Sequence, residues 1–327
     1  MTNKLLTVGV DLGGTKIAFG ALDQEGTLYH QEIIKTRVSD GPLAIVADVI
    51  AAVNRIKEKE PSCQFLGVGI GMAGQIEKQT GAVFFSTNLG WQNFPLQEMV
   101  AKEMQLPVYV LNDVRAAAFG EWVVGAGKGS KDILCVFVGT GIGGGVVSDS
   151  MLLEGDTNAA AEIGHFTIDL QGPKCTCGNT GCFEAFAGGW AIAKRAKELI
   201  RQNMSDGQDI LKLVDGKVDA LTTKHVFEAY RCGAALAKQV VEELTLALIA
   251  GTSGLVNIFN PERLILGGSI CVGNSELIEA VHQGVLKKSL KISTRNLKIM
   301  AASLGNSAGV IGAAMYAKKK IEEGNKR

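Results

Sequence analysis

The sequence has no excess of either charge and contains few prolines and aromatic residues. Lysine and arginine together number 33, as do aspartate and glutamate, so the formal net charge is zero. A protein devoted to nucleic acid or to a membrane surface needs a concentrated basic field, and the even balance argues against both classes. Only six prolines accompany 41 glycines. Glycine enrichment without proline indicates tight turns and close backbone contacts in an ordered chain rather than disorder.

Long hydrophobic runs are also missing. No uninterrupted apolar run reaches the roughly 18 residues that a membrane span needs. The apolar run near the N-terminus is about six residues long, too short for a secretory signal. We therefore expect a cytoplasmic protein whose thiols stay reduced. With 327 residues, the chain exceeds the ~250–300 residues at which a single core stops growing, so two domains are expected.

The order of apolar runs and turns predicts an α/β chain. Strands are expected at Leu5–Val10, 17–22 and 27–35, joined as an antiparallel meander with a glycine turn after the first strand. A related pattern of strand, glycine-rich turn and further strands begins at Asp132, which suggests two similar halves. The clearest late strand is expected within 255–268.

These patterns define the expected domains. A small α/β domain is expected at 1–112, completed by a C-terminal helix at 306–327 for which Ser307 is a candidate N-cap. A large α/β domain at 113–305 would carry the cysteine-rich segment described below.

Two glycine-rich turns have the composition of phosphate-binding loops. The backbone N–H groups of such a turn form a concave site for phosphate oxygens, and the missing side chains let the ligand approach. In the first turn, Asp11 is suited to a metal–water cluster, and Thr15 and Lys16 are suited to phosphate oxygens. A glycine hairpin that holds no ligand is the competing interpretation.

The second turn, GTGIGGG, also matches the dinucleotide fingerprint at Gly139, Gly141 and Gly144. That fingerprint needs a helix directly after the turn, whereas the residues that follow here predict a hairpin. A stretch similar to a P-loop has Gly129 where serine or threonine should bind magnesium. Both motifs are therefore rejected. Two phosphate-type turns opening two similar halves instead predict a nucleotide bound in an interdomain cleft.

The ordered motifs DLGGTK, LND, GTGIGGG, EIGH and CTCGNTGCFE resemble those of the ROK family of bacterial sugar kinases and repressors. Their spacing is similar to that of its glucokinase branch, and the resemblance runs from Val10 to Gly309. It implies the two-domain actin-like (ribonuclease H-like) ATPase fold with an interdomain cleft. It also implies that ATP with Mg²⁺ phosphorylates a hexose, with glucose converted to glucose 6-phosphate as the expected reaction.

Asp113 follows a predicted strand, where an α/β sheet commonly presents ligand-binding residues. A carboxylate there can accept the proton of an attacking hydroxyl, although aspartate is also a good N-cap for the helix that follows. The resemblance implies that Asp113 is the catalytic base and that Asn112 contacts a sugar hydroxyl. It further implies sugar contacts for Glu162, His165 and Glu184, whose side chains suit hydroxyl recognition.

The resemblance also implies the nucleotide contacts. Glycine turns would surround the phosphates, the magnesium would be reached through water from an aspartate, and a strand ending in two glycines would lie near the adenosine. The residues concerned are Asp11, Gly13, Gly14, Thr15, Lys16, Thr140, Gly141, Gly267 and Gly268.

Three cysteines lie within eight residues in the stretch KCTCGNTGCFE. A redox pair more commonly has the spacing C-x-x-C, and a disulfide knot suits neither a reducing compartment nor an odd number of thiols. With a histidine ten residues upstream, the stretch offers the Cys₃His donors of a closed structural zinc site. The predicted ligands are His165, Cys175, Cys177 and Cys182. Because Glu162 and Glu184 lie close to these ligands in sequence, a bound Zn²⁺ would hold both sugar-binding carboxylates in place.

Three alternatives stay open within the resemblance: a kinase for N-acetylglucosamine or N-acetylmannosamine, a broad-specificity hexose kinase, and a sugar-sensing regulator. The repressor branch carries a helix-turn-helix segment before the first glycine turn, and a first strand at Leu5 favours the kinase. Residues Asn88–Trp91 read NLGW where glucokinase-like members often read NLPGW, a departure that bears on hexose preference. The resemblance implies a homodimer that binds sugar and ATP, without nucleic-acid or membrane partners.

Overall fold

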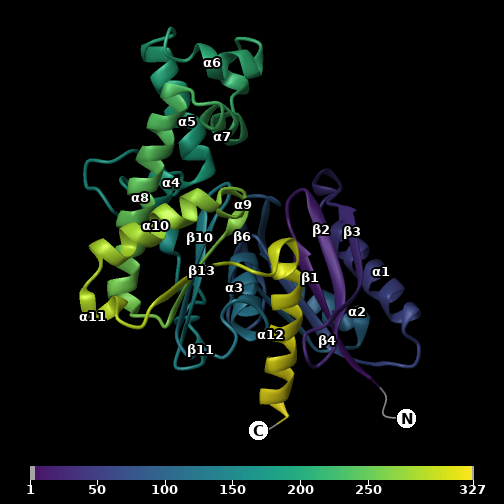
Figure 1. Ribbon diagram of the computed structural model, residues 1–327. Helices are drawn as coiled ribbons and strands as arrows, with labels where there is room; N and C mark the ends of the chain where they lie inside the picture. The colour runs from purple at the N-terminus through teal and green to yellow at the C-terminus, as the bar shows by residue number, and fades with distance from the viewer. Residues whose placement is uncertain (1–3, 326–327) are drawn as a thin grey trace. The chain divides into compact units, whose positions relative to one another are not determined.

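The computed structural model describes residues 4–325, which form two compact units (Figure 1). The described part of the first unit contains residues 4–133, Gly145–Ala161 and residues 302–325, and the second unit contains Leu134–Gly144 and Glu162–Ala301. The first unit continues beyond residue 112, because the helix that starts there packs against the C-terminal helix.

The first unit is built on a five-stranded sheet of order β3-β2-β1-β4-β8. Its first three strands form the predicted antiparallel meander, and β4 and β8 run parallel to β1 and β4 respectively. Nearly every residue of β1 and β2 is buried, as expected for strands covered on both faces. The strands are β1 (Leu5–Leu12), β2 (Lys16–Leu22), β3 (Leu28–Lys35), β4 (Gln64–Met72) and β8 (Val108–Asn112).

Helices form two separate hydrophobic cores with this sheet. One core joins the sheet to α1 and α2, and the other joins it to α3 and α12. These helices are α1 (Pro42–Lys59), α2 (Leu96–Met104), α3 (Asp113–Val123) and α12 (Ala308–Gly324), with 3₁₀ turns at Val38–Asp40 and Gly305–Ser307. Three short strands, β5 (Gln75–Ile76), β6 (Val83–Ser86) and β7 (Trp91–Phe94), make a second sheet, and β11 (Met151–Leu152) pairs with the end of β10.

The helix α12 contacts the sheet backbone to backbone. A Cβ atom on Gly9 in β1 would lie 2.0 Å from the carbonyl oxygen of Val310, so a side chain there would force the helix away from the sheet. This close packing places the N-terminus of α12 beside the first candidate carboxylate. A Cβ atom on Gly309 would lie only 2.7 Å from the carboxyl carbon of Asp11.

The second unit combines part of another sheet with most of the helices. Its strands follow the order β10-β9-β12-β13, and β12 and β13 are parallel. The strands are β9 (Ile133–Val138), β10 (Ile142–Ser148), β12 (Arg263–Gly267) and β13 (Lys298–Ala301). The α-helices are α4 (Phe183–Ala187), α5 (Gly189–Gln202), α6 (Gln208–Leu211), α7 (Thr223–Arg231), α8 (Ala235–Phe259), α9 (Gly268–Val272), α10 (Ser275–Lys288) and α11 (Lys291–Thr294). The 3₁₀ turns are η2 (Ile163–His165), η3 (Lys212–Val214) and η4 (Val218–Ala220).

The helix α8 has the length and apolarity of a membrane span, although glycine, threonine and serine at 251–254 interrupt its apolar sequence. Half of its most apolar window is buried inside the protein. A Cβ atom on Gly251 would lie 2.6 Å from the ring of Phe183, so α8 packs closely on α4. These contacts are those of a core helix.

Two local predictions were wrong in part. Ser307 occupies the N-cap position of α12 but makes no capping hydrogen bond, and its hydroxyl instead accepts one from Nε2 of Gln31 at 3.1 Å. The late strand is shorter than predicted, because residues 255–259 form the end of α8. Asn260 ends that helix in the left-handed region, with φ 44°, and Pro261 cannot continue it.

Candidate active site

Asp11 and Asp113 lie together in the first unit. Asp11 is near the carboxyl end of β1, and Asp113 directly follows β8 and begins α3. Burial and the charge of Asp113 raise the pKa of Asp11 to about 6, against an opposing effect of Lys16. Two carboxylates that repel each other in a partly buried place favour a nearby cation or proton, as expected of residues that act on a metal-bound phosphate.

Asn112 is the N-cap of α3. Its Oδ1 accepts hydrogen bonds from the backbone N–H groups of Val114 and Arg115 at 3.0 and 3.1 Å, and its Nδ2 donates to the carbonyl of Gly74 at 3.3 Å. Asn112 therefore occupies the N-cap position that the competing interpretation gave to Asp113, although Oδ1 of Asp113 also accepts a hydrogen bond from the Val114 N–H at 2.9 Å. Asp113 is the first residue of the helix, where the positive end of the helix dipole stabilises a carboxylate.

The first glycine turn is closed by Thr36, a residue that the sequence analysis missed. The Gly13 N–H donates to the carbonyl of Lys16 at 3.1 Å. The buried Thr36 donates its hydroxyl to the carbonyl of Gly13 at 2.7 Å and its N–H to that of Thr15 at 3.0 Å. With the turn fixed in this way, the side chains of Thr15 and Lys16 remain exposed. Gly14 packs against Asn88, which lies in the NLGW segment.

The second glycine turn is held by the N-terminus of α5. The Gly189 N–H donates to the carbonyl of Gly139 at 2.9 Å, and the Trp190 N–H donates to that of Thr140 at 3.0 Å. The first donors of a helix have no partner within the helix, and here they fix the turn that joins β9 to β10. Thr140 is exposed at the tip of the turn.

Gly267 and Gly268 lie beside the same turn. Gly268 has φ 85°, and a Cβ atom on it would lie 2.3 Å from the carbonyl oxygen of Val138, the last residue of β9. Only glycine fits this conformation and this close approach. The structure therefore brings the predicted adenosine-side glycines next to Gly139.

Glu184 is buried, and both of its carboxylate oxygens are engaged. Oε2 accepts a hydrogen bond from the Ile142 N–H at 2.8 Å, and Oε1 accepts one from the indole N–H of Trp190 at 3.1 Å. A Cβ atom on Gly141 would lie 2.2 Å from Oε2. This carboxylate, predicted only as a sugar contact, thus also braces the second glycine turn. Trp190 was missed, because nothing in its local sequence marks a contact that the fold creates.

Glu162 and His165 flank the turn η2. Glu162 is exposed, and its carbonyl accepts a hydrogen bond from the His165 N–H at 3.1 Å. A Cβ atom on Gly164, between them, would lie 2.2 Å from the carbonyl oxygen of Ile142 and 3.4 Å from Cβ of Glu184. The missing side chain at Gly164 therefore lets η2 lie against both the glycine turn and Glu184.

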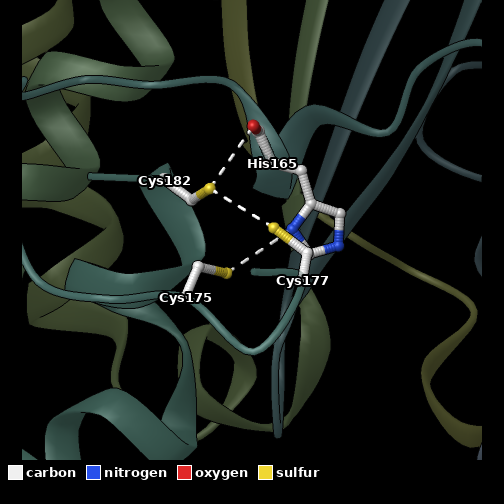
Figure 2. A group of neighbouring side chains, drawn as sticks. All are labelled: His165, Cys175, Cys177 and Cys182. Carbon is white, nitrogen blue, oxygen red and sulfur yellow. Dashed lines mark hydrogen bonds between the residues drawn. The ribbon is translucent and has the colours of Figure 1, made fainter. Parts of the chain in front are cut away.

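The four predicted metal ligands form one cluster (Figure 2). Nδ1 of His165 lies 3.7 Å from Sγ of Cys175, and the Sγ atoms of Cys177 and Cys182 are also 3.7 Å apart. All four donor atoms lie within 4.8 Å of one another. A tetrahedral zinc ion separates sulfur ligands by about 3.8 Å, given Zn–S bonds of about 2.3 Å. The donors thus fit such an ion, and the Nε2 edge of His165 faces away from the sulfur atoms (Figure 2).

Two glycines shape the loop that carries these cysteines. Gly178 and Gly181 have φ values of 94° and 73°, in the left-handed region. A Cβ atom on Gly181 would lie 1.7 Å from the carbonyl oxygen of Asp169. The Cys175 N–H donates to the carbonyl of Asn179 at 2.9 Å and closes the turn. The sequence GNTG therefore returns the chain toward the first two cysteines, as predicted.

The thiols of the cluster differ in acidity. Burial, together with its cysteine neighbours, raises the pKa of Cys182 to about 12. A backbone hydrogen bond from Asn179 holds the pKa of the exposed Cys177 below its ordinary value. A buried thiol resists ionisation unless a cation compensates the charge, and a coordinating thiolate obtains that compensation from the metal.

Each unit thus assembles one set of predicted residues. In the first unit the set comprises Asp11, Gly13, Gly14, Thr15, Lys16, Asn112 and Asp113. In the second unit it comprises Thr140, Gly141, Glu162, His165, Glu184, Gly267 and Gly268, together with Cys175, Cys177 and Cys182.

Known proteins resemble the chain over nearly its whole length. A model of the ROK family matches residues 7–320. The glucokinase of Streptomyces coelicolor is 35% identical over 315 residues, which cover 96% of this chain and 98% of that enzyme. The crystal structure of a ROK family glucokinase from Streptomyces griseus, in complex with glucose and AMPPNP, superposes with a TM-score of 0.80 at 35% identity and covers 96% of this chain and 99% of that one. The xylose repressor of Caldicellulosiruptor bescii is 32% identical over 307 residues, 93% of this chain and 76% of the repressor.

Proposed function

We propose that this chain, which belongs to the ROK family and is an ATP-dependent hexokinase, converts glucose to glucose 6-phosphate with Asp113 as general base. The family and the actin-like (ribonuclease H-like) ATPase fold predicted from the motifs are both confirmed. The observation that carries the proposal is the place of Asp113. It begins a helix that Asn112 caps, and its charge acts on Asp11 beside the first glycine turn.

In the proposed reaction, Asp113 accepts the proton of the sugar 6-hydroxyl as its oxygen forms a bond to the γ-phosphorus of ATP. The bond between that phosphorus and the β,γ-bridging oxygen breaks, and ADP leaves with the electron pair. Magnesium supplied with ATP would neutralise phosphate charge, and Asp11 would contact it through water. In this proposal Gly13, Gly14, Thr15, Lys16, Thr140 and Gly141 would bind the phosphates, and Gly267 and Gly268 would lie near the adenosine.

The proposed sugar contacts have polar atoms that can bind hydroxyl groups. Asn112 has one side-chain N–H left after its bond to the Gly74 carbonyl. Glu162 is exposed, and Glu184 retains lone pairs beyond the two hydrogen bonds that it accepts. The Nε2 edge of His165 faces away from the cysteines (Figure 2). Buried hydroxyls need such matched partners, since each unmatched polar group costs about 1–3 kcal/mol.

We also propose that His165, Cys175, Cys177 and Cys182 bind a structural zinc ion. The donor set and the 3.7 Å separations support this site. When bound, the metal cross-links η2 to the cysteine loop. That cross-link would hold Glu162, His165 and Glu184 at a fixed separation.

A coupled ADP-release assay on the unmodified protein tests the function. Glucose, mannose, fructose, N-acetylglucosamine and N-acetylmannosamine serve as acceptors, each with ATP and Mg²⁺. We expect the highest kcat/KM with glucose. The highest value with an N-acetylated sugar would instead assign a hexosamine kinase, and comparable values with several hexoses would assign a broad-specificity enzyme. Sugar binding without turnover of any sugar would assign a regulator, a role found among the repressor relatives.

A further inference from the structure

We propose that Trp190 is a positioning residue that links the sugar-binding carboxylate to the second phosphate-binding turn. The proposal rests on the function proposed above. Trp190 would couple Glu184, in the cysteine-rich motif, to the turn GTGIGGG, which lies in a separate motif of the sequence.

Trp190 makes two hydrogen bonds with different targets. Its indole N–H donates to Oε1 of Glu184 at 3.1 Å, and its backbone N–H donates to the carbonyl of Thr140 at 3.0 Å. The second carboxylate oxygen of Glu184 accepts the Ile142 N–H at 2.8 Å. A closed ring of hydrogen bonds therefore joins the carboxylate, the indole and the glycine turn.

The ring leaves the carboxylate little freedom to rotate. Both N–H donors lie on fixed elements, since Ile142 begins β10 and Trp190 is the second residue of α5. The glycine backbone packs closely against this side chain, because a Cβ atom on Gly188 would lie 2.9 Å from Cγ of Glu184. With one donor removed, Glu184 would turn about its side-chain bonds, and the lone pairs aimed at a sugar would change direction.

The same indole also touches the metal cluster. Trp190 packs, half-buried, against Cys175, Cys182 and Ala185, which are all buried. A displacement of the cysteine cluster would therefore shift Trp190 and the hydrogen bonds that orient Glu184. Sugar binding to Glu184 would, through the same side chain, affect the turn at Thr140. Trp190 is thus the side chain through which sugar binding would tighten nucleotide binding.

The substitution Trp190→Phe tests this role, because it removes the indole N–H and keeps an aromatic ring. We expect about a 10-fold loss of glucose affinity, as for a hydrogen bond to a charged group. We further expect glucose to enhance AMPPNP affinity less than in the unsubstituted protein, with zinc content unchanged. Calorimetry with glucose, with AMPPNP, and with AMPPNP at saturating glucose measures the affinities, and elemental analysis measures the zinc content. The matched control is Trp122→Phe, which loses an indole hydrogen bond to the Ser130 carbonyl, 2.8 Å long, far along the chain from these residues.

A second measurement does not depend on the folding of that variant. Glucose should change the tryptophan emission of the unsubstituted protein and of Trp122→Phe, because the Trp190 indole bonds to the carboxylate that meets the sugar. Unchanged emission in both proteins at saturating glucose would overturn the proposal, as would equal affinities in Trp190→Phe and Trp122→Phe. A protein that binds glucose with these signatures but phosphorylates no sugar would refute the proposed function alone.

Discussion

Asp11 and Asp113 come from the end of β1 and the start of α3, and their carboxylates interact. Burial first, and then the charge of Asp113, raise the pKa of Asp11 from 3.8 to about 6. Ionisation of Asp11 is therefore disfavoured by its burial and by the negative charge of Asp113. A nearby cation would offset this unfavourable free energy.

This relationship predicts how stability depends on pH. The folded protein holds the proton on Asp11 up to about pH 6, whereas the unfolded chain releases it near pH 4. The folded state binds more protons in that window, so the contribution of Asp11 to the free energy of unfolding falls as pH rises through it. Asp11→Asn should thus be more stable than the parent at pH 8, by up to about 3 kcal/mol, and equally stable near pH 3. Urea unfolding at both pH values, without nucleotide, measures the difference. An equal difference at both pH values would contradict the assignment.

Asp113→Asn should abolish turnover and preserve sugar binding. An amide cannot accept the proton of the attacking hydroxyl, so kcat should fall at least 10²- to 10⁴-fold, the usual contribution of a general base. Asn112 caps α3 whichever residue follows it, so the helix should remain intact. ADP release and calorimetry with glucose are the measurements, and Asp206→Asn, at an exposed position, is the control. Activity within a few-fold of the parent would eliminate Asp113 as the base.

Cys177→Ser should lose zinc and weaken sugar binding. Cys177 is exposed, so serine at this position leaves no cavity, and any effect follows from the missing ligand. We expect one zinc per chain in the parent, well under one in the variant, and at least a several-fold loss of glucose affinity. Elemental analysis and calorimetry are the measurements. The control is Cys232→Ser, another exposed cysteine, outside the cluster. Full glucose affinity in a zinc-free variant would separate the metal from the sugar contacts.

Glu121→Gln should destabilise the first unit. The side chain of Glu121 is fully buried in α3 and accepts hydrogen bonds from the N–H groups of Ala126, Ser303 and Leu304, at 2.8–2.9 Å, and from the Ser303 hydroxyl. A glutamine must turn an NH₂ group toward one of these donors, which should lower the free energy of unfolding by about 2–4 kcal/mol. Glu98→Gln, at an exposed site on α2, should change it by less than about 0.5 kcal/mol. Urea unfolding compares the two variants, and equal values would show that the buried network contributes nothing.

Local patterns sufficed for much of the fold and for part of the site. The meander, the two glycine turns and the return of the cysteine loop depend on neighbours in sequence, and the structure has all three. The extent of the late strand was overestimated, because apolar residues at 255–259 suit a helix as well as a strand. The cap of α3 could not be read from the sequence, since Asn112 and Asp113 are both good caps; the structure places Asn112 at the N-cap position.

By itself, the sequence determined which chemistry is present: carboxylates after strands, glycines where phosphate can approach, and one histidine with three cysteines at metal-binding spacing. These features depend on residue type and on separations of a few residues, so they can be recognised from the sequence without the fold. The tertiary structure alone decided that Thr36 closes the first turn and that Trp190 and Ile142 donate hydrogen bonds to the Glu184 carboxylate. It also decided that the charge of Asp113 raises the pKa of Asp11. Such contacts join residues that are far apart along the chain or lie on different elements. Only the packing of strands and helices brings them within hydrogen-bonding or electrostatic range.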